Sequence, residues 1–350
     1  MKNISDIDKN FKIETTLNLS DVQFYDVRQE PFSVHGVFYA DGKFRRIPQE
    51  IAEAVNDGVL RLHSNTAGGR VRFKTNSQYI AIYAKMPTIS KMSHMALTGS
   101  AGFDLYVRED GKQFYKGTFI PPKSIVDYYE SKIDFDNSTM REITINMPLY
   151  SDVTELYIGL QKNAKIYSSP QYKNVKPIVF YGSSITQGGC ASRPGNSYQG
   201  FLERRFDTDY INLGFAGSAT GEDKVADYIS SLDMSVFIYD YDYNAPDAEH
   251  LKNTHEQMFL KIRQAQPDLP IIMMSVPNFL PSVALCERYN IIKTTYNKAL
   301  NRQDKNVYLI DGPMLMAKAG SEGTVDNTHP NDLGFYSMAC AIGDVIDKIL

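Results

Sequence analysis

The sequence has few cysteines and no excess of basic residues. The three cysteines, Cys190, Cys286 and Cys340, are odd in number and widely spaced, and they form no CxxC or related metal-binding pattern. Free thiols in a reducing compartment are the simplest interpretation. With 37 basic and 41 acidic side chains, the formal net charge is -4, whereas nucleic-acid-binding proteins are usually strongly basic. The composition therefore predicts no nucleic-acid partner.

Long hydrophobic runs are also missing. The longest, such as Leu269–Val276, fall far short of the roughly 18 apolar residues that indicate a transmembrane helix, so we expect no membrane partner. The first residues, MKNISDIDKNFKIE, mix charges throughout and lack the apolar core of a secretory signal. From these absences we expect a cytoplasmic protein.

The chain length and the local patterns predict two domains. A chain of 350 residues exceeds the size at which one hydrophobic core usually stops growing. Apolar residues make up 43% and charged residues 22%, as in ordinary globular proteins. The pattern changes around a turn-rich stretch that includes Ser168–Pro170. We therefore expect domains at residues 1–171 and 172–350.

The first of these regions has the pattern of an antiparallel β-sandwich. Its readable segments are short and alternate apolar with polar residues, which is typical of half-buried strands: Val71–Lys74, Tyr79–Lys85, Phe103–Arg108 and Glu142–Met147. Three turn signals predict hairpins: Asp41-Gly42, Gly68-Gly69 and Asp110-Gly111. One short helix is expected near residues 48–56.

The second region alternates apolar strands with longer helical patterns. The expected strands are Ile178–Tyr181, Tyr210–Leu213, Val236–Tyr241, Pro270–Val276 and Val307–Ile310. The expected helices are Ser197–Phe206, Asp223–Ser231, Ala248–Gln266, Ser282–Asn301 and Asn331–Leu350. This order predicts an α/β domain in which a parallel sheet has helices on both faces.

The loop after the first of these strands exposes a serine. In the segment Tyr181–Gly188, glycine permits a tight strand-to-helix turn that leaves the hydroxyl of Ser184 near a helix N-terminus, where backbone N–H groups can support an oxyanion. The alternative is that Ser183 and Ser184 serve only as helix caps. A nucleotide-binding loop is disfavoured because both the GxGxxG pattern and a GK[ST] ending are missing.

A second informative segment, Asp326–Asn331, precedes the last expected helix. A carboxylate three residues before a histidine can fold back and accept the Nδ1–H of His329, which leaves Nε2 free to act as a base. Pro330 suits the first turn of a helix. The alternative is a surface turn with a capping aspartate.

Two further loops supply amide donors. Asn212–Ser218 follows the second expected strand and contains Gly217, and Asp240–Asn244 follows the third. Each alone could be an ordinary turn. Because the carboxyl ends of parallel strands share one edge of a sheet, all four segments are expected at one site.

These segments resemble the sequence blocks of SGNH (GDSL-like) hydrolases, over about residues 175–350. Gly182-Ser183-Ser184-Ile185 resembles the GDS[IL] block, Gly217 the glycine block, Asn244 the asparagine of the GxND block, and Asp326–His329 the DxxH block. The resemblance implies a flavodoxin-like three-layer domain with Ser184 as nucleophile, His329 as general base and Asp326 as its orienting partner. It implies an oxyanion hole formed by the backbone N–H groups of Ser184 and Gly217 and the side-chain amide of Asn244, with no cofactor and no metal. Ser183 in place of the usual aspartate, and Asp242-Tyr243-Asn244-Ala245 in place of GxND, indicate a divergent branch.

The first region supports the same interpretation. Gly102–Tyr106 resembles the GxDLY segment of a β-domain that precedes some SGNH hydrolases, and this architecture resembles two-domain carbohydrate acetylesterases with a jelly-roll-like module. By analogy we expect hydrolysis of a short acyl ester, acetate above all, from a small-molecule substrate such as an acetylated oligosaccharide. The alternatives are a lysophospholipase or thioesterase acting on longer acyl chains, and a non-catalytic carbohydrate-binding protein. The sequence leaves open whether the protein is a homo-oligomer.

Overall fold

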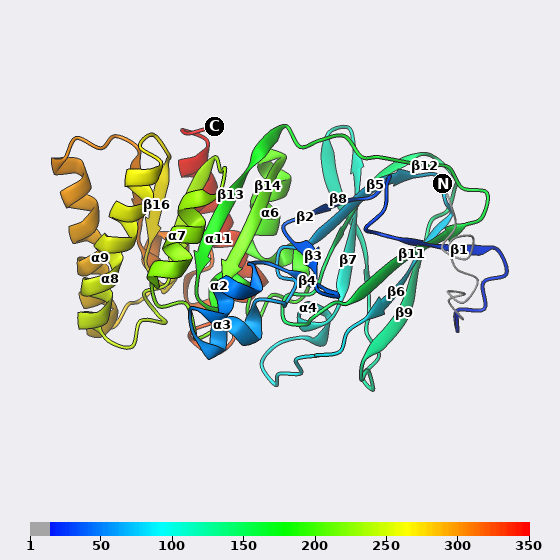
Figure 1. Cartoon of the computed structure of the whole chain (residues 1–350), viewed down its shortest axis with the longest axis horizontal. Helices are drawn as coiled ribbons and strands as arrows, with labels where there is room; N and C mark the ends of the chain where they lie inside the picture. Colours follow the sequence, from blue (N-terminus) through cyan, green and yellow to red (C-terminus); the bar gives the residue numbers. More distant parts are fainter. Residues whose placement is uncertain (1–14) are drawn as a thin grey trace. The chain divides into compact units, whose positions relative to one another are not determined.

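The computed structural model describes residues 15–350 (Figure 1). The N-terminal segment on which the expectation of a missing secretory signal depends lies outside the described residues. Within residues 15–350, none of the helices combines the length and the apolar composition that a membrane crossing requires.

The chain forms two compact units whose ranges differ from the expected ones in two places. Residues 46–63 pack with the second unit, which also contains residues 172–192 and 196–350, and residues 193–195 pack with the first. The reason for the first difference is burial: Ala52, Val59 and Leu62 lie in the same apolar core as Val179 and Leu213 of the second unit. A segment from the β-rich half of the sequence is therefore part of the α/β unit.

The first unit is an antiparallel β-sandwich, as predicted. One sheet has the order β1-β11-β6-β9, from Val22–Asp26, Glu155–Gln161, Tyr79–Lys85 and Tyr128–Asp134. The other has the order β12-β5-β10-β7-β8, from Ile166–Tyr167, Arg70–Thr75, Arg141–Asn146, Phe103–Glu109 and Lys112–Phe119, with β2 (Ser33–His35) also paired to β5. A short helix α4 (Leu97–Ser100) precedes β7. The alternating side chains expected to be buried meet across strands, since Phe73 pairs with Ile143 in register and both are fully buried.

Two of the three expected hairpin turns are present. Asp41-Gly42 joins β3 (Phe38–Ala40) to β4 (Lys43–Arg45), and Asp110-Gly111 joins β7 to β8; all four turn residues have positive φ. The prediction for Gly68-Gly69 was wrong. That pair makes a local turn at the entrance to β5, where the Gly69 N–H donates to the Thr66 carbonyl at 2.7 Å, and no strand precedes it there.

The buried Asp104 of the GxDLY segment is held by polar partners within the first unit. Its Oδ1 accepts from Asn146 Nδ2 at 2.7 Å, and its Oδ2 accepts from the Gly195 N–H at 2.9 Å and pairs with Arg193 Nη1 at 2.8 Å. The aspartate therefore ties residues 193–195 to strand β7, which explains a buried charge in an apolar strand.

The second unit is a parallel sheet covered by helices on both faces, as predicted (Figure 1). Its strand order, β14-β13-β15-β16-β17, is the flavodoxin-like order 2-1-3-4-5. The strands are β13 Asn174–Gly182, β14 Thr208–Gly214, β15 Val236–Asp240, β16 Ile271–Met274 and β17 Val307–Ile310. The helices are α2 Gln49–Glu53, α3 Asp57–Leu62, α5 Ser184–Gln187, α6 Tyr198–Phe206, α7 Asp223–Ser231, α8 Ala248–Ala265, α9 Val283–Asn301, α10 Gly312–Leu315 and α11 Asp332–Ile346.

Alternate residues of the central strand β13 point to opposite faces of this sheet. Val179 and Tyr181 lie in the core that contains α7, α8 and α9. On the other face, the ring of Phe180 packs edge-on against Tyr198 of α6, which stacks on Phe335 of α11. The helix expected near residues 48–56 is α2, and a second short helix, α3, follows it. Asn56 caps α3 by accepting from the Val59 N–H at 2.9 Å.

Candidate active site

The two serines in the turn after β13, Ser183 and Ser184, have different roles. Ser183 is the cap of α5, since its Oγ accepts from the Ile185 N–H at 3.1 Å, whereas Ser184 is the first helical residue and is half-buried. Glycine is required before them, because a Cβ on Gly182 would lie 1.8 Å from Asp240 Oδ1. The capping interpretation therefore holds for Ser183, and the hydroxyl of Ser184 has another partner.

That partner is the imidazole of His329. Ser184 Oγ lies 2.9 Å from His329 Nε2, and His329 Nδ1 lies 2.8 Å from Asp326 Oδ2. The other carboxylate oxygen, Oδ1, accepts from the backbone N–H groups of His329 at 2.8 Å and Thr328 at 3.1 Å. Partial burial acts to raise the pKa of Asp326, but these hydrogen bonds outweigh it and hold the pKa below its ordinary value. The carboxylate is thus kept ionised beside the imidazole.

The loop that carries the histidine is closed by its own backbone. Asn327 has a left-handed conformation, with φ of 65°, which turns the chain so that Asp326 and His329 face each other. The Val325 N–H donates to the His329 carbonyl at 2.9 Å, and Asn331 caps α11 by accepting from the Gly334 N–H at 3.0 Å. The segment is therefore a turn in which the aspartate binds backbone N–H groups, as in the alternative interpretation. Its histidine also lies within hydrogen-bonding distance of Ser184.

The two expected amide-donor loops begin at the same edge of the sheet as the serine turn. Gly182 at the end of β13 is in register with Gly214 of β14 and Asp240 of β15. Gly217 has a φ of 66° and is exposed. The side-chain amide of Asn244 donates to the Phe215 carbonyl at 3.0 Å, which fixes it against the glycine loop.

Two arginines that sequence reasoning missed hold these loops through main-chain carbonyls. The buried Arg46 donates to the carbonyls of Asn212 at 3.1 Å and Gly214 at 2.5 Å, and to Leu62 at 2.7 Å, and its guanidinium lies 4.7 Å from the ring centre of Phe215.

Arg288 of α9 acts in a similar way on the other loop, since its Nη1 donates to the carbonyls of Asp242 and, at 3.0 Å, Ala245. A third side chain, Asn56, donates through Nδ2 to the Ser218 carbonyl at 3.1 Å. No sequence pattern predicted these contacts, because each joins residues far apart in the chain.

Two buried carboxyl groups lie behind the serine turn, at the end of β15. Burial raises the pKa of Asp240 well above its ordinary value, and Thr186 Oγ1 donates to its Oδ1. Burial likewise raises the pKa of Asp242 to about 7, although the Val276 N–H donates to its Oδ2 at 3.1 Å. Burial thus favours the neutral form of Asp240 and shifts the titration of Asp242 into the neutral pH range, unlike Asp326.

Other candidate side chains of this unit have structural partners. Burial raises the pKa of the Cys190 thiol to about 11, so it stays protonated near neutral pH. Burial lowers the pKa of His255 to about 3, and its Nδ1 lies 3.0 Å from Thr295 Oγ1. His250 Nε2 lies 2.8 Å from the Thr220 carbonyl. These groups are not suited to replace Ser184 or His329.

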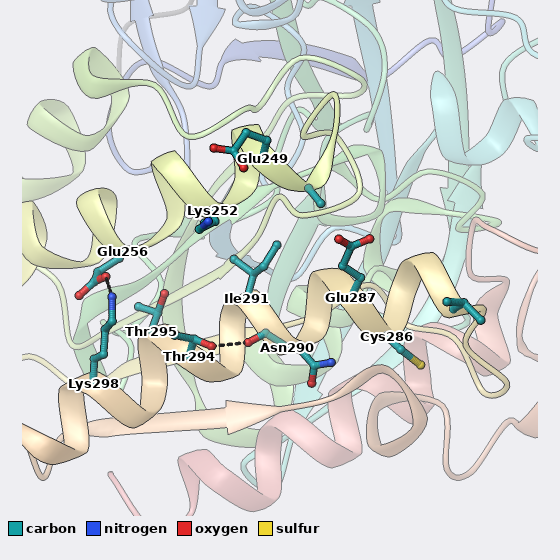
Figure 2. A pocket seen from close by; sticks show the side chains of 12 residues that line it. Glu249, Lys252, Glu256, Cys286, Glu287, Asn290, Ile291, Thr294, Thr295 and Lys298 are labelled. Carbon is teal, nitrogen blue, oxygen red and sulfur yellow. Dashed lines mark hydrogen bonds and ion pairs between the residues drawn. The ribbon is translucent and has the colours of Figure 1, made fainter.

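Two cavities of this unit differ in their relation to the serine and histidine. One, of about 360 Å³, is lined by Tyr243, Asn327 and Thr328, which adjoin the residues described above. The other, of about 700 Å³, lies between α8 and α9, and Figure 2 shows its polar walls, with Lys298 paired to Glu256 at 2.6 Å. None of the residues that line the second cavity belongs to the serine turn, the two donor loops or the histidine loop.

Comparison with known families agrees with this architecture. Residues 175–347 match the model of the GDSL-like lipase/acylhydrolase family, and residues 22–166 match the model of the N-terminus of SGNH-hydrolase-type esterases. No curated protein matched the chain.

Solved structures share the fold. A protein from Bacteroides ovatus assigned to the GDSL-like lipases is 28% identical, with a TM-score of 0.84 and coverage of 94% of this chain and 98% of that one. A salicylyl-acyltransferase from a tetracycline biosynthetic pathway is 19% identical, with a TM-score of 0.74 and coverage of 94% and 98%. A family two carbohydrate esterase from Clostridium thermocellum, in complex with cellohexaose, is 14% identical, with a TM-score of 0.64 and coverage of 91% and 98%. The chain therefore belongs to the GDSL-like lipase/acylhydrolase (SGNH) family of ester hydrolases and carries the N-terminal domain of its SGNH-hydrolase-type esterases.

Proposed function

We propose that the protein hydrolyses short acyl esters, acetyl esters above all, of a carbohydrate, through an acyl enzyme on Ser184. The observation that carries this proposal is the continuous line of hydrogen-bonding atoms from Ser184 Oγ through His329 to Asp326, with distances of 2.9 and 2.8 Å. A serine with a base in reach, and a base oriented by a carboxylate, is the arrangement of an activated nucleophile.

In the first half of the reaction, Ser184 Oγ attacks the carbonyl carbon while its proton passes to His329 Nε2. The electron pair of the C=O bond moves to the oxygen, where the N–H groups of Ser184 and Gly217 and the amide of Asn244 stabilise it; such a donor commonly contributes about 3 to 4 kcal/mol. The C–O bond then breaks and His329 protonates the leaving alcohol. Asp326 stabilises the imidazolium formed in between.

In the second half, water replaces the alcohol. His329 Nε2 takes a proton from the water as its oxygen attacks the acyl carbon, and the same proton returns to Ser184 Oγ when the acyl–serine bond breaks. The products are a carboxylic acid and the free enzyme. In both halves of the cycle His329 is the group of the chain that takes up the proton and later returns it.

The preference for acetylated carbohydrate is supported by the fold shared with a carbohydrate esterase. At 14% identity, the substrate class is inferred from the shared fold by analogy. A lysophospholipase or thioesterase would show rising kcat/KM from acetyl to octanoyl esters. A non-catalytic carbohydrate-binding protein would bind oligosaccharide without reacting with a fluorophosphonate.

The test is Ser184→Ala, assayed on p-nitrophenyl acetate and by acetate release from acetylated oligosaccharides. We expect kcat to fall by about 10⁴-fold or more, and fluorophosphonate labelling to disappear, because the nucleophile is lost. Ser197→Ala is the matched control: it removes a hydroxyl that caps α6 by accepting from the Gly200 N–H, and turnover should persist. Unchanged turnover in Ser184→Ala would exclude this serine from the mechanism.

A further inference from the structure

The cavity of about 360 Å³ lies between two parts of the proposed catalytic machinery. Asn327 and Thr328 line it and are the residues between Asp326 and His329, and Tyr243, which precedes Asn244, lines it as well. Tyr243 OH lies 3.2 Å from Thr328 Oγ1. The cavity is therefore lined by residues that adjoin the proposed base and a proposed oxyanion donor in the sequence.

The cavity has one charged side chain. Its lining is otherwise apolar, as at Val276, Pro277 and Leu285, or neutral and polar, as at Asn278; Arg288 alone is ionisable at neutral pH. A cation with no acidic side chain beside it in the lining attracts an anionic ligand. The composition of the cavity therefore favours a ligand that carries negative charge.

Arg288 is fixed in place yet not neutralised by an ion pair. A single nitrogen, Nη1, makes both hydrogen bonds to the carbonyls of Asp242 and Ala245, which leaves Nε and Nη2. Across the part of the chain that the structure describes, Arg288 forms no ion pair, and neither Nε nor Nη2 is buried without a partner. Both remaining nitrogens are thus accessible to a ligand.

The carboxyl group of Asp242, whose main chain binds Arg288, does not occupy this position. The Asp242 side chain is fully buried, and its Oδ2 accepts from the Val276 N–H rather than from Arg288. Burial, the larger effect, raises the pKa of Asp242 to about 7, whereas the charge of Arg288 acts to lower it. A second anion is therefore needed to use the two accessible guanidinium nitrogens.

The chemistry of the proposed reaction places the alcohol part of the ester on this side. His329 must deliver a proton to the leaving oxygen, so the leaving alcohol lies near His329, whose neighbours Asn327 and Thr328 line the cavity. The planar guanidinium edge matches the two oxygens of a carboxylate. We propose that this cavity binds the alcohol part of the substrate, and that Arg288 binds a carboxylate on it, so that the substrates are acyl esters of a carboxylate-bearing alcohol such as a sugar acid.

This inference rests on the proposed esterase function, and a pair of isosteric substrates separates the two. The probes are 4-acetoxybenzoate and 4-acetoxybenzamide, with the 3-substituted isomers to vary the reach; each pair differs in the carboxylate charge. We expect the wild-type protein to favour the carboxylate in kcat/KM by about tenfold to a hundredfold, the range for a hydrogen bond to a charged group. Failure to hydrolyse any of these esters, p-nitrophenyl acetate included, would count against the esterase function itself.

The variants use the ratio of kcat/KM between the two probes as the readout. Because Arg288 also holds the loop of Asn244, its loss lowers turnover of both probes, and the ratio removes that shared effect. We expect Arg288→Gln to bring the ratio close to one and Arg288→Lys, which keeps the charge, to retain part of it. Arg302→Gln is the matched control at the other end of α9, where Arg302 pairs with Glu256, and should keep the wild-type ratio.

Two results would overturn the proposal. One is a wild-type ratio near one for both isomer pairs while p-nitrophenyl acetate is hydrolysed. The other is a charge preference that appears with p-nitrophenyl hemisuccinate over p-nitrophenyl acetate and depends on Arg288, because it would place the anion on the acyl side.

Discussion

Replacing Asp326 with asparagine tests how the proposed base is kept in its active form. Oδ1 of Asp326 accepts from two backbone N–H groups, so in the variant the amide oxygen takes this position and the NH2 group faces His329 Nδ1. An NH2 group donates, so the imidazole must accept at Nδ1 and carry its proton on Nε2. A protonated Nε2 cannot take the proton of Ser184.

We expect Asp326→Asn to lower kcat by about 10⁴-fold, equivalent to about 5 kcal/mol of transition-state stabilisation, with little change in KM. The assay is steady-state hydrolysis of p-nitrophenyl acetate, together with ¹⁵N NMR of the imidazole to identify the protonated nitrogen. Because the side chain of Asp326 is exposed, the free energy of unfolding should change by less than about 1 kcal/mol.

Two further variants make this test specific. Asp326→Ala removes the carboxylate without imposing a tautomer, so the smaller alanine should be less damaging than the isosteric asparagine. Asp311→Asn is the control, since Asp311 caps α10 by accepting from the Met314 N–H and asparagine caps equally well. A loss of less than tenfold in Asp326→Asn, with Nε2 shown to be unprotonated, would refute the reasoning.

Two predictions concern groups around the site. Arg46→Lys should lower kcat by about tenfold with KM within twofold, and it should lower the free energy of unfolding by about 1 to 3 kcal/mol, because lysine cannot reach all three carbonyls. Steady-state kinetics and urea unfolding measure these two effects. A tenfold rise in KM would contradict a positioning role. For Asp242, the raised pKa means that stability present at low pH is lost as pH rises from about 4 through about 7, by up to about 4 kcal/mol. Asp242→Asn should therefore gain stability relative to the wild type over that window, and parallel stability curves would contradict the burial effect.

The sequence was a good guide where the local pattern decides structure. The apolar runs and flanking turns of the second unit predicted α7 and β17 with the bounds that the structure has, Asp223–Ser231 and Val307–Ile310. They predicted the other strands of its sheet to within a few residues, and the loops at the strand ends followed from the rule that ligand sites lie at carboxyl ends. The structure brings Ser184, Asp326 and His329 together there.

The same reasoning failed where tertiary contacts decide structure. Residues 46–63 were assigned to the β-rich half because they are embedded in it, yet Ala52 and Val59 have their apolar partners more than 100 positions later in the sequence. Periodicity describes which face of a segment is buried and carries no information on which distant surface covers it. The partners of Arg46 could not be predicted for the same reason, since they are main-chain carbonyls, which residues of every type carry.

Those carbonyls matter to the proposed catalysis because their oxygens carry partial negative charge. In the proposed mechanism, the loops after β14 and β15 present N–H groups to a developing oxyanion, and any carbonyl in the same loop that turned toward it would repel it. Arg46 binds the carbonyls of Asn212 and Gly214, and Arg288 binds those of Asp242 and Ala245, so in each loop a cation holds the acceptors to one side. The Phe215 carbonyl between them accepts from Asn244 itself. The proposed donors would therefore be held in place before charge develops on the substrate, because the neighbouring carbonyl acceptors are already bound by Arg46, Arg288 and Asn244.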